Sequence, residues 1–171
     1  PKGTSVVVYR DKNFRKYQYT TNAEWVGGTY VSPGIGGSRS GGIMAATWAV
    51  MVTLGKEGYM ERARKIFETA FTMQKSVTRH PELRLMGSPT FCFSFTSDVF
   101  DIYHLNDFMK DRGWRFNGQQ YPSAIHMCVT GPQTQPGLAE EFDRDLAEAV
   151  AYAKKPARSI AKSGALYGGQ G

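Results

Sequence analysis

The sequence predicts an α/β fold: a small unit of βαββα order from about Met86 onward, preceded by the edge of a larger domain and by connecting helices. Two observations predict it, namely short segments that alternate apolar and polar residues and longer segments with the apolar period of amphipathic helices. The 171 residues are 41% hydrophobic and 21% charged, an ordinary globular mixture that suffices for one domain. Mean hydropathy is −0.40. No apolar stretch of this sequence is long enough to span a bilayer.

The first third of the chain predicts a strand and a long irregular segment. Residues Thr4 to Tyr9 are rich in β-branched side chains and are expected to form a buried strand. Because no residues precede this strand to pair with it, we expect the chain to be a C-terminal fragment of a longer protein. Residues 20–42 are rich in turn formers, and so long an irregular segment is more often functional than a linker.

Two helices are expected next. Residues Ile43 to Leu54 are apolar nearly all round, which predicts a buried helix. The sequence GKEG at residues 55–58 ends it, and a second helix is expected from Tyr59 to about Val77. One face of the second helix is charged and is predicted to lie in water: Glu61, Arg62, Arg64, Lys65 and Glu68.

The small unit begins after His80-Pro81. Strands are predicted at residues 83–86, 90–96, 114–116 and 124–129, and helices at Ile102 to Asp111 and Leu138 to Ala153. Cys92 and Cys128 lie in predicted strands and are expected to be buried thiols, since two cysteines without a CxxC pattern do not form a disulfide scaffold. The three histidines lack the spacing of metal ligands, so no metal site is expected.

The run GIGGSRSGG, from Gly34 to Gly42, is the first candidate binding element. Glycine-rich turns ahead of a helix can present backbone N–H groups to a phosphate. The run is not a dinucleotide fingerprint, because Arg39 takes the place of the third glycine, and it lacks the Lys-Ser/Thr of a Walker A loop. An anion site and a flexible connection both remain open, and Ser38 and Arg39 favour the anion site. Tyr167, in a glycine-rich tail, either closes over a site or anchors the tail.

The net charge of +6 allows an anionic partner. A module that binds nucleic acid or anionic lipid needs a concentrated basic face, whereas the charges here alternate in sign along each predicted helix. We therefore expect no nucleic-acid partner.

Blocks along the whole chain carry a resemblance to a known family. These blocks are PKGTS at residues 1–5, WVGGTY at 25–30, SP at 32–33, GSRSGG at 37–42, GKEGY at 55–59, FDIY at 100–103, PSAIH at 122–126 and GALYG at 164–168. In this order and at compatible spacing, they resemble the sphingosine-1-phosphate lyase family. That family depends on pyridoxal phosphate (PLP) and is related to the group II amino-acid decarboxylases.

The resemblance implies the aspartate aminotransferase-like fold of PLP-dependent transferases and an obligate homodimer with active sites at the subunit interface. Residues 1–42 would be the end of the large PLP-binding domain with a glycine-rich active-site loop. Residues 43–80 would be connecting helices, and residues 81–171 the C-terminal small α/β domain with an active-site tail. The N-terminal remainder of the same enzyme would complete the protein. We expect it to be cytoplasmic if bacterial, and membrane-anchored facing the cytosol if eukaryotic.

The reaction implied by the resemblance is a retro-aldol cleavage of a phosphorylated sphingoid base into a fatty aldehyde and phosphoethanolamine. Lys2, Ser38 and Tyr167 match the family's substrate-phosphate site. Tyr30, Gly36, Gly37 and Arg39 are expected to shape the loop or to lie near the cofactor.

The catalytic lysine is not expected in this chain. In the family the Schiff-base lysine lies just upstream of the segment that matches Pro1, so Lys2 is not that lysine and the chain alone should be inactive. Two alternatives are kept open. A fragment of a PLP-dependent amino-acid decarboxylase would share the fold but lack the substrate-phosphate residues, and a basic anion-binding module would need a concentrated basic face.

Overall fold

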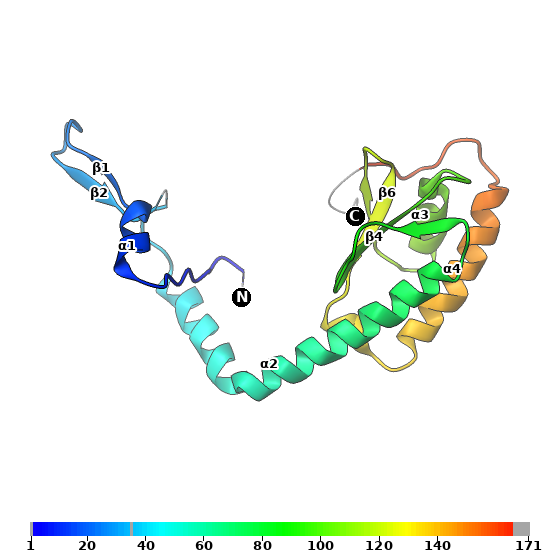
Figure 1. The fold of residues 1–171 in the computed structure, drawn as a ribbon, viewed down its shortest axis with the longest axis horizontal. Coiled ribbons are helices and arrows are strands. Elements are labelled where there is room, and N and C mark those ends of the chain that lie inside the picture. The colour runs from blue at the N-terminus through cyan, green and yellow to red at the C-terminus, as the bar shows by residue number, and fades with distance from the viewer. Residues whose placement is uncertain (1, 35, 166–171) are drawn as a thin grey trace. The chain divides into compact units, whose positions relative to one another are not determined.

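The structure, a computed structural model, describes residues 2–34 and 36–165 (Figure 1). The chain divides into two units, Pro1–Glu57 and Gly58–Gly171. The elements of the first unit are α1 (Lys12–Arg15), the 3₁₀ helix η1 (Lys16–Gln18), β1 (Thr20–Asn22), β2 (Tyr30–Ser32) and the start of α2 (Gly41–Thr78). The second unit holds the rest of α2, then β3 (Leu83–Leu85), β4 (Cys92–Ser97), α3 (Ile102–Asp111), β5 (Asn117–Gln119), β6 (Ala124–Cys128), the 3₁₀ helix η2 (Gly131–Thr134) and α4 (Leu138–Lys154).

The strand predicted at Thr4 to Tyr9 does not form, and that prediction is wrong. These residues belong to no helix or strand. Val6, Val7 and Val8 are 73%, 67% and 86% exposed. A β-branched run favours extended backbone, but a strand also needs a neighbour with which to exchange hydrogen bonds. Within the part of the chain that the structure describes, no strand pairs with this segment.

The segment predicted to be irregular contains a short hairpin. Strands β1 and β2 pair antiparallel, with Thr20 opposite Ser32 and Asn22 opposite Tyr30. The connection turns at Gly28, whose φ of 101° favours glycine and whose N–H donates to the carbonyl of Trp25. Strands of three mostly exposed residues leave no apolar alternation in the sequence, which is why pattern reasoning missed them.

Helix α2 contains the predicted break. Gly55 has φ 58° and ψ −174°, a conformation outside the helical region that separates two helical stretches. The helix before the break was predicted to be buried, and this is wrong for the chain as described: Trp48 is 67% exposed and Val52 is 62% exposed. An apolar sequence specifies a helix that needs cover, but it does not supply the covering surface.

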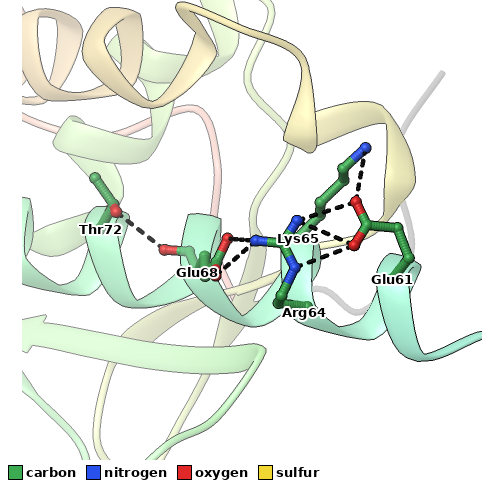
Figure 2. A network of polar contacts seen from close by, with 5 residues as sticks. All are labelled: Glu61, Arg64, Lys65, Glu68 and Thr72. Atoms are coloured by element: carbon green, nitrogen blue, oxygen red, sulfur yellow. Dashed lines mark hydrogen bonds and ion pairs between the residues drawn. The ribbon is translucent and has the colours of Figure 1, made fainter.

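The stretch of α2 after the break carries its charges on the outside, as predicted. Arg64 donates to Glu61 at 3.0 Å and to Glu68 at 2.7 Å, while Lys65 lies 3.2 Å from Glu61 (Figure 2). Hydrogen bonds from Arg64 and then Lys65 lower the pKa of the Glu61 carboxyl below its ordinary value. Since all these side chains are about half exposed, the network gives the helix only weak support.

The second unit is built on a four-stranded sheet in the order β3-β4-β6-β5, with every pair antiparallel (Figure 1). One face of β4 contributes Phe93 and Phe95 to the core, where they meet apolar residues of α2, α3 and α4, among them Met73, Leu105, Met109, Phe142 and Leu146. The order β4-α3-β5-β6-α4 is the predicted βαββα arrangement. Helix α3 has the predicted bounds.

Two predictions within this unit are wrong. Residues 114–116 are not a strand. The backbone N–H of Trp114 donates to the carbonyl of Met109 at the end of α3, and its side chain is buried. Strand β5 begins only at Asn117. The two cysteines are exposed rather than buried. Alternation along β4 and β6 places Cys92 and Cys128 opposite each other on the face away from Phe93.

Candidate functional site

The glycine-rich loop between β2 and α2 is held at its start by a buried serine. Ser32 is 8% exposed, accepts the backbone N–H of Gly34 at 3.3 Å and donates to the Gly34 carbonyl at 2.5 Å. A serine hydroxyl that bonds backbone two residues onward fixes a turn. Sequence reasoning assigned Ser32 no such role, although a Ser-Pro pair is itself a turn signal.

Arg39 folds back over the loop in which it lies. Its Nη1 donates to the carbonyls of Gly37, at 3.3 Å, and of Ser38, at 3.2 Å. A Cβ built on Gly36 would lie 1.6 Å from Arg39 Nη2, so a side chain at position 36 would displace the end of this flexible arginine. These contacts keep the Arg39 side chain on the loop itself. A position near the cofactor remains a prediction.

Lys2 and Ser38 are both exposed. Ser38 precedes the first residue of α2 by three positions. Lys2 is followed by Gly3, where φ is 95° and a Cβ would stand 3.4 Å from Ile43 Cδ1, in the first turn of α2. The N-terminal end of a helix carries partial positive charge, so the serine hydroxyl three residues ahead of α2 lies where an anion is favoured.

The net charge of the first unit also favours an anion. Residues 1–57 hold seven lysines and arginines against three acidic residues, so four of the six net positive charges of the whole chain lie there. Ammonium, guanidinium, hydroxyl and backbone N–H donors together are suited to a phosphate group. Such donors suit the phosphate of a substrate and the phosphate of PLP equally well.

The remaining predicted residues do not all join this cluster. Tyr30 is exposed on β2, opposite Asn22, and its ring meets Trp25 edge-on at 5.6 Å. Tyr167 lies outside the described residues. A separate open hollow of about 580 Å³ in the first unit is lined by none of the predicted site residues; its walls are Val7, Val8, Tyr9, Asp11, Lys12, Arg15 and Gln18.

Among residues 2–34 and 36–165, no three histidine, cysteine or acidic side chains are grouped as metal ligands would be. No helix there has both the length and the apolar character needed to cross a bilayer.

Comparison with known proteins shows a consistent likeness. No family model matches the chain. It is 41% identical over 170 residues to the sphingosine-1-phosphate lyase of Drosophila melanogaster, covering 98% of this chain and 31% of that protein. It is likewise 41% identical over 173 residues to the sphingosine-1-phosphate lyase of Oryza sativa, covering 100% of this chain and 32% of that protein. The chain thus spans about a third of the length of the curated relatives it matches.

Solved structures agree. The sphingosine-1-phosphate lyase of Burkholderia pseudomallei superposes with a TM-score of 0.77 at 65% identity, covering 85% of this chain and 33% of that one. A glutamate decarboxylase of Lactobacillus brevis superposes with a TM-score of 0.65 over 89% of this chain and 37% of that one. At 19% identity the second likeness concerns the fold alone. Together they confirm the predicted fold class.

Proposed function

This chain is homologous to the sphingosine-1-phosphate lyases over nearly its whole length and corresponds to their C-terminal part, and from this premise we propose that the intact protein is a PLP-dependent carbon–carbon lyase. Its substrate would be a phosphorylated sphingoid base, cleaved into a fatty aldehyde and phosphoethanolamine. The 65% identity to a lyase of known structure over 85% of the chain is the observation that carries the proposal.

The role proposed for this chain is to bind the phosphate end of the substrate. Lys2 would provide an ammonium and Ser38 a hydroxyl beside the glycine N–H groups, and Tyr167 would add a phenol. The phosphate lies away from the bond that breaks, so these contacts would orient the substrate and supply binding energy from a remote group. The exposure of Lys2 and Ser38, and the place of Ser38 three residues before α2, support this role.

PLP, when bound, supplies an electron sink for the pair released as the carbon–carbon bond breaks. The contribution proposed for this chain is the loop: Tyr30, Gly36, Gly37 and Arg39 would shape it beside the cofactor. We propose that the lysine that binds PLP belongs to another part of the protein. Residues 1–171 alone would therefore show no turnover. We also propose a homodimer in which the loop reaches the subunit interface.

The experiment uses the intact protein with PLP and compares a phosphorylated sphingoid base with its unphosphorylated form. We expect fatty aldehyde and phosphoethanolamine in equal amounts by mass spectrometry. Loss of the phosphate contacts should lower kcat/KM on the order of a hundredfold. Release of CO₂ from an amino acid such as glutamate, without aldehyde from the phosphorylated base, would instead favour the decarboxylase alternative.

A further inference from the structure

Two exposed cysteines face each other across the central strands of the second unit's sheet. Cys92, on β4, lies opposite Cys128, on β6, and both are free thiols. We propose that they form a reversible disulfide bond when the protein meets a low-molecular-weight disulfide such as glutathione disulfide. This modification site is independent of the proposed function, since none of the residues proposed to bind substrate or to shape the loop takes part in it.

The hydrogen bonds around the two cysteines decide how closely they face each other. The N–H of Val129 donates to the carbonyl of Phe91 at 3.0 Å. These two residues directly follow Cys128 and directly precede Cys92, so they form the hydrogen-bonded pair of the ladder. The carbonyl of Ser94, two residues along β4 from Cys92, accepts its hydrogen bond from the segment after β3 and not from β6. Cys92 and Cys128 are therefore a non-hydrogen-bonded pair.

Such a pair has the spacing that a disulfide needs. In a non-hydrogen-bonded antiparallel pair the Cα atoms lie about 4.5 Å apart. Disulfides span Cα separations of about 4.4–6.8 Å, so a bond can form here without a change of register. The two thiols already interact, because the charge of Cys128 and a hydrogen bond with it, after desolvation, raise the pKa of the Cys92 thiol.

The reaction exchanges one disulfide for another. The thiolate of one cysteine attacks a sulfur of glutathione disulfide, which breaks that S–S bond, releases one glutathione and leaves a mixed disulfide on the protein. The second cysteine attacks the protein sulfur of the mixed disulfide and releases the second glutathione. The two cysteines lose two electrons, glutathione disulfide gains them, and the two thiol protons pass to the released glutathiones. Because the second attack is between neighbours, it needs no further encounter in solution.

The bond would join the two halves of the sheet. The strand order β3-β4-β6-β5 places β4 and β6 at the centre, and the chain between the two cysteines contains α3 and β5 (Figure 1). A cross-link that closes this loop restricts the unfolded chain, so the oxidised protein should resist unfolding more than the reduced protein. Exposed disulfides are also the more easily reduced ones, which favours a reversible modification over a permanent structural bond.

The test uses the intact protein with PLP, held to equilibrium in buffers of reduced glutathione and glutathione disulfide. An equilibrium measurement is chosen because the raised pKa of Cys92 slows its attack. After acid quenching and alkylation of the remaining thiols, trypsin separates the two cysteines by cutting after Arg84, Lys110, Arg115 and Arg144. We expect mass spectrometry to find peptides 85–110 and 116–144 joined, two hydrogens lighter than their sum, and dithiothreitol to separate them.

Three variants serve as controls. Cys92→Ser and Cys128→Ser should each abolish the joined peptides and leave the other cysteine bound to glutathione. The matched control is Cys92→Ser/Ser94→Cys, which moves the thiol two residues along the same face of β4, to the position opposite His126. Cys92 Sγ lies 3.9 Å from His126 Nδ1, so the short diagonal joins positions 92 and 126, and position 94 is on the long diagonal from Cys128. The equilibrium constant for disulfide formation should be on the order of tenfold larger in the wild type than in this control.

Each outcome decides the matter. Joined peptides that form in the native protein and separate on reduction support the modification site, as does a higher urea midpoint of the oxidised protein. The inference is overturned if each cysteine takes up glutathione without joining the other, if neither reacts in the native protein, or if they join only in urea. It is also overturned if the matched control oxidises as readily as the wild type, or if oxidation lowers the urea midpoint, because the strands would then have to part to make the bond.

Discussion

Trp114 donates its indole N–H to the carboxylate of Asp145 at 2.7 Å, and both residues are 7% exposed. The other oxygen of Asp145 accepts from Arg112 Nη1, also at 2.7 Å. A carboxylate is costly to bury unless its oxygens are bonded, and here each oxygen has a donor. The contact joins the segment after α3 to the middle of α4.

Replacing Asp145 should therefore destabilise the second unit. Asp145→Ala leaves the buried indole N–H of Trp114 without its acceptor, and we expect a loss of about 3 kcal/mol in the free energy of unfolding. Urea denaturation followed by tryptophan fluorescence measures it. Glu148→Gln is the matched control, because Glu148 pairs with the same Arg112 but is 57% exposed and should matter little. Equal losses in the two variants would contradict the assignment.

The ion pair between Glu82 and Lys154 predicts a pH dependence. The hydrogen bond from Lys154 holds the pKa of the Glu82 carboxyl below its ordinary 4.5. A lowered pKa in the folded state stabilises the fold above the unfolded pKa, and that contribution disappears as pH falls through the folded value. Glu82→Gln should thus lower the urea midpoint near neutral pH and have no effect in strong acid. A difference that persists in strong acid would place the cause elsewhere.

The parts of the fold that sequence predicted well are those fixed by local residues. Helix α3 begins where Asp101 caps it, its carboxylate accepting the N–H of Tyr103, and such caps are visible in sequence. The break at Gly55 is equally local. The strand prediction at residues 114–116 was wrong because Asp145, distant in sequence, holds Trp114 in the core. The strand prediction at Thr4 to Tyr9 was wrong because a strand needs a second segment to pair with, and one segment's sequence does not show whether that partner is there.

In the candidate site, too, the features fixed by local sequence could be predicted and those that depend on conformation could not. A glycine-rich run before a helix indicates an anion loop, and Arg39 and Ser38 were singled out from it. That Arg39 turns back onto Gly37 is a matter of conformation, which composition does not encode. The pairing of Lys2 and Ser38 with Tyr167 came from the resemblance to the family alone.

The position of Cys92 opposite Cys128 predicts that the Cys92 thiol reacts slowly with alkylating agents. Cys92 lies opposite Cys128, and partial desolvation of its sulfur first, then the neighbouring thiol, raises the pKa of Cys92 above its ordinary 9.0, although the residue as a whole is exposed. A higher pKa leaves less thiolate at a given pH, so iodoacetamide should alkylate Cys92 slowly and its rate should rise only at higher pH. Cys128→Ser removes the neighbouring thiol, so the pH dependence of Cys92 alkylation should shift to lower pH. A profile centred below 9.0 in the wild type would contradict this.

The proposed binding of the substrate phosphate by Lys2, Ser38 and Tyr167 can be tested through kcat/KM of the intact enzyme. Lys2→Ala would remove the charged donor proposed to bind the substrate phosphate, and such a contact is worth about 1.5–3 kcal/mol, so kcat/KM for the phosphorylated base should fall about tenfold to a hundredfold or more. Ser38→Ala and Tyr167→Phe remove neutral donors and should cost less. None of the three should weaken PLP binding much, because we expect other parts of the protein to hold the cofactor's phosphate.

The control is Lys12→Ala, which removes an exposed lysine of the same unit that lies on α1 and is not among the predicted site residues. It should leave kcat/KM unchanged, which separates a specific contact from the general positive charge of residues 1–57. Activity with the unphosphorylated base, where measurable, should not respond to Lys2→Ala, since the missing partner is the phosphate itself. If Lys2→Ala and Ser38→Ala leave turnover intact, or release PLP in a titration, these residues do not bind substrate phosphate and the decarboxylase-like alternative gains support.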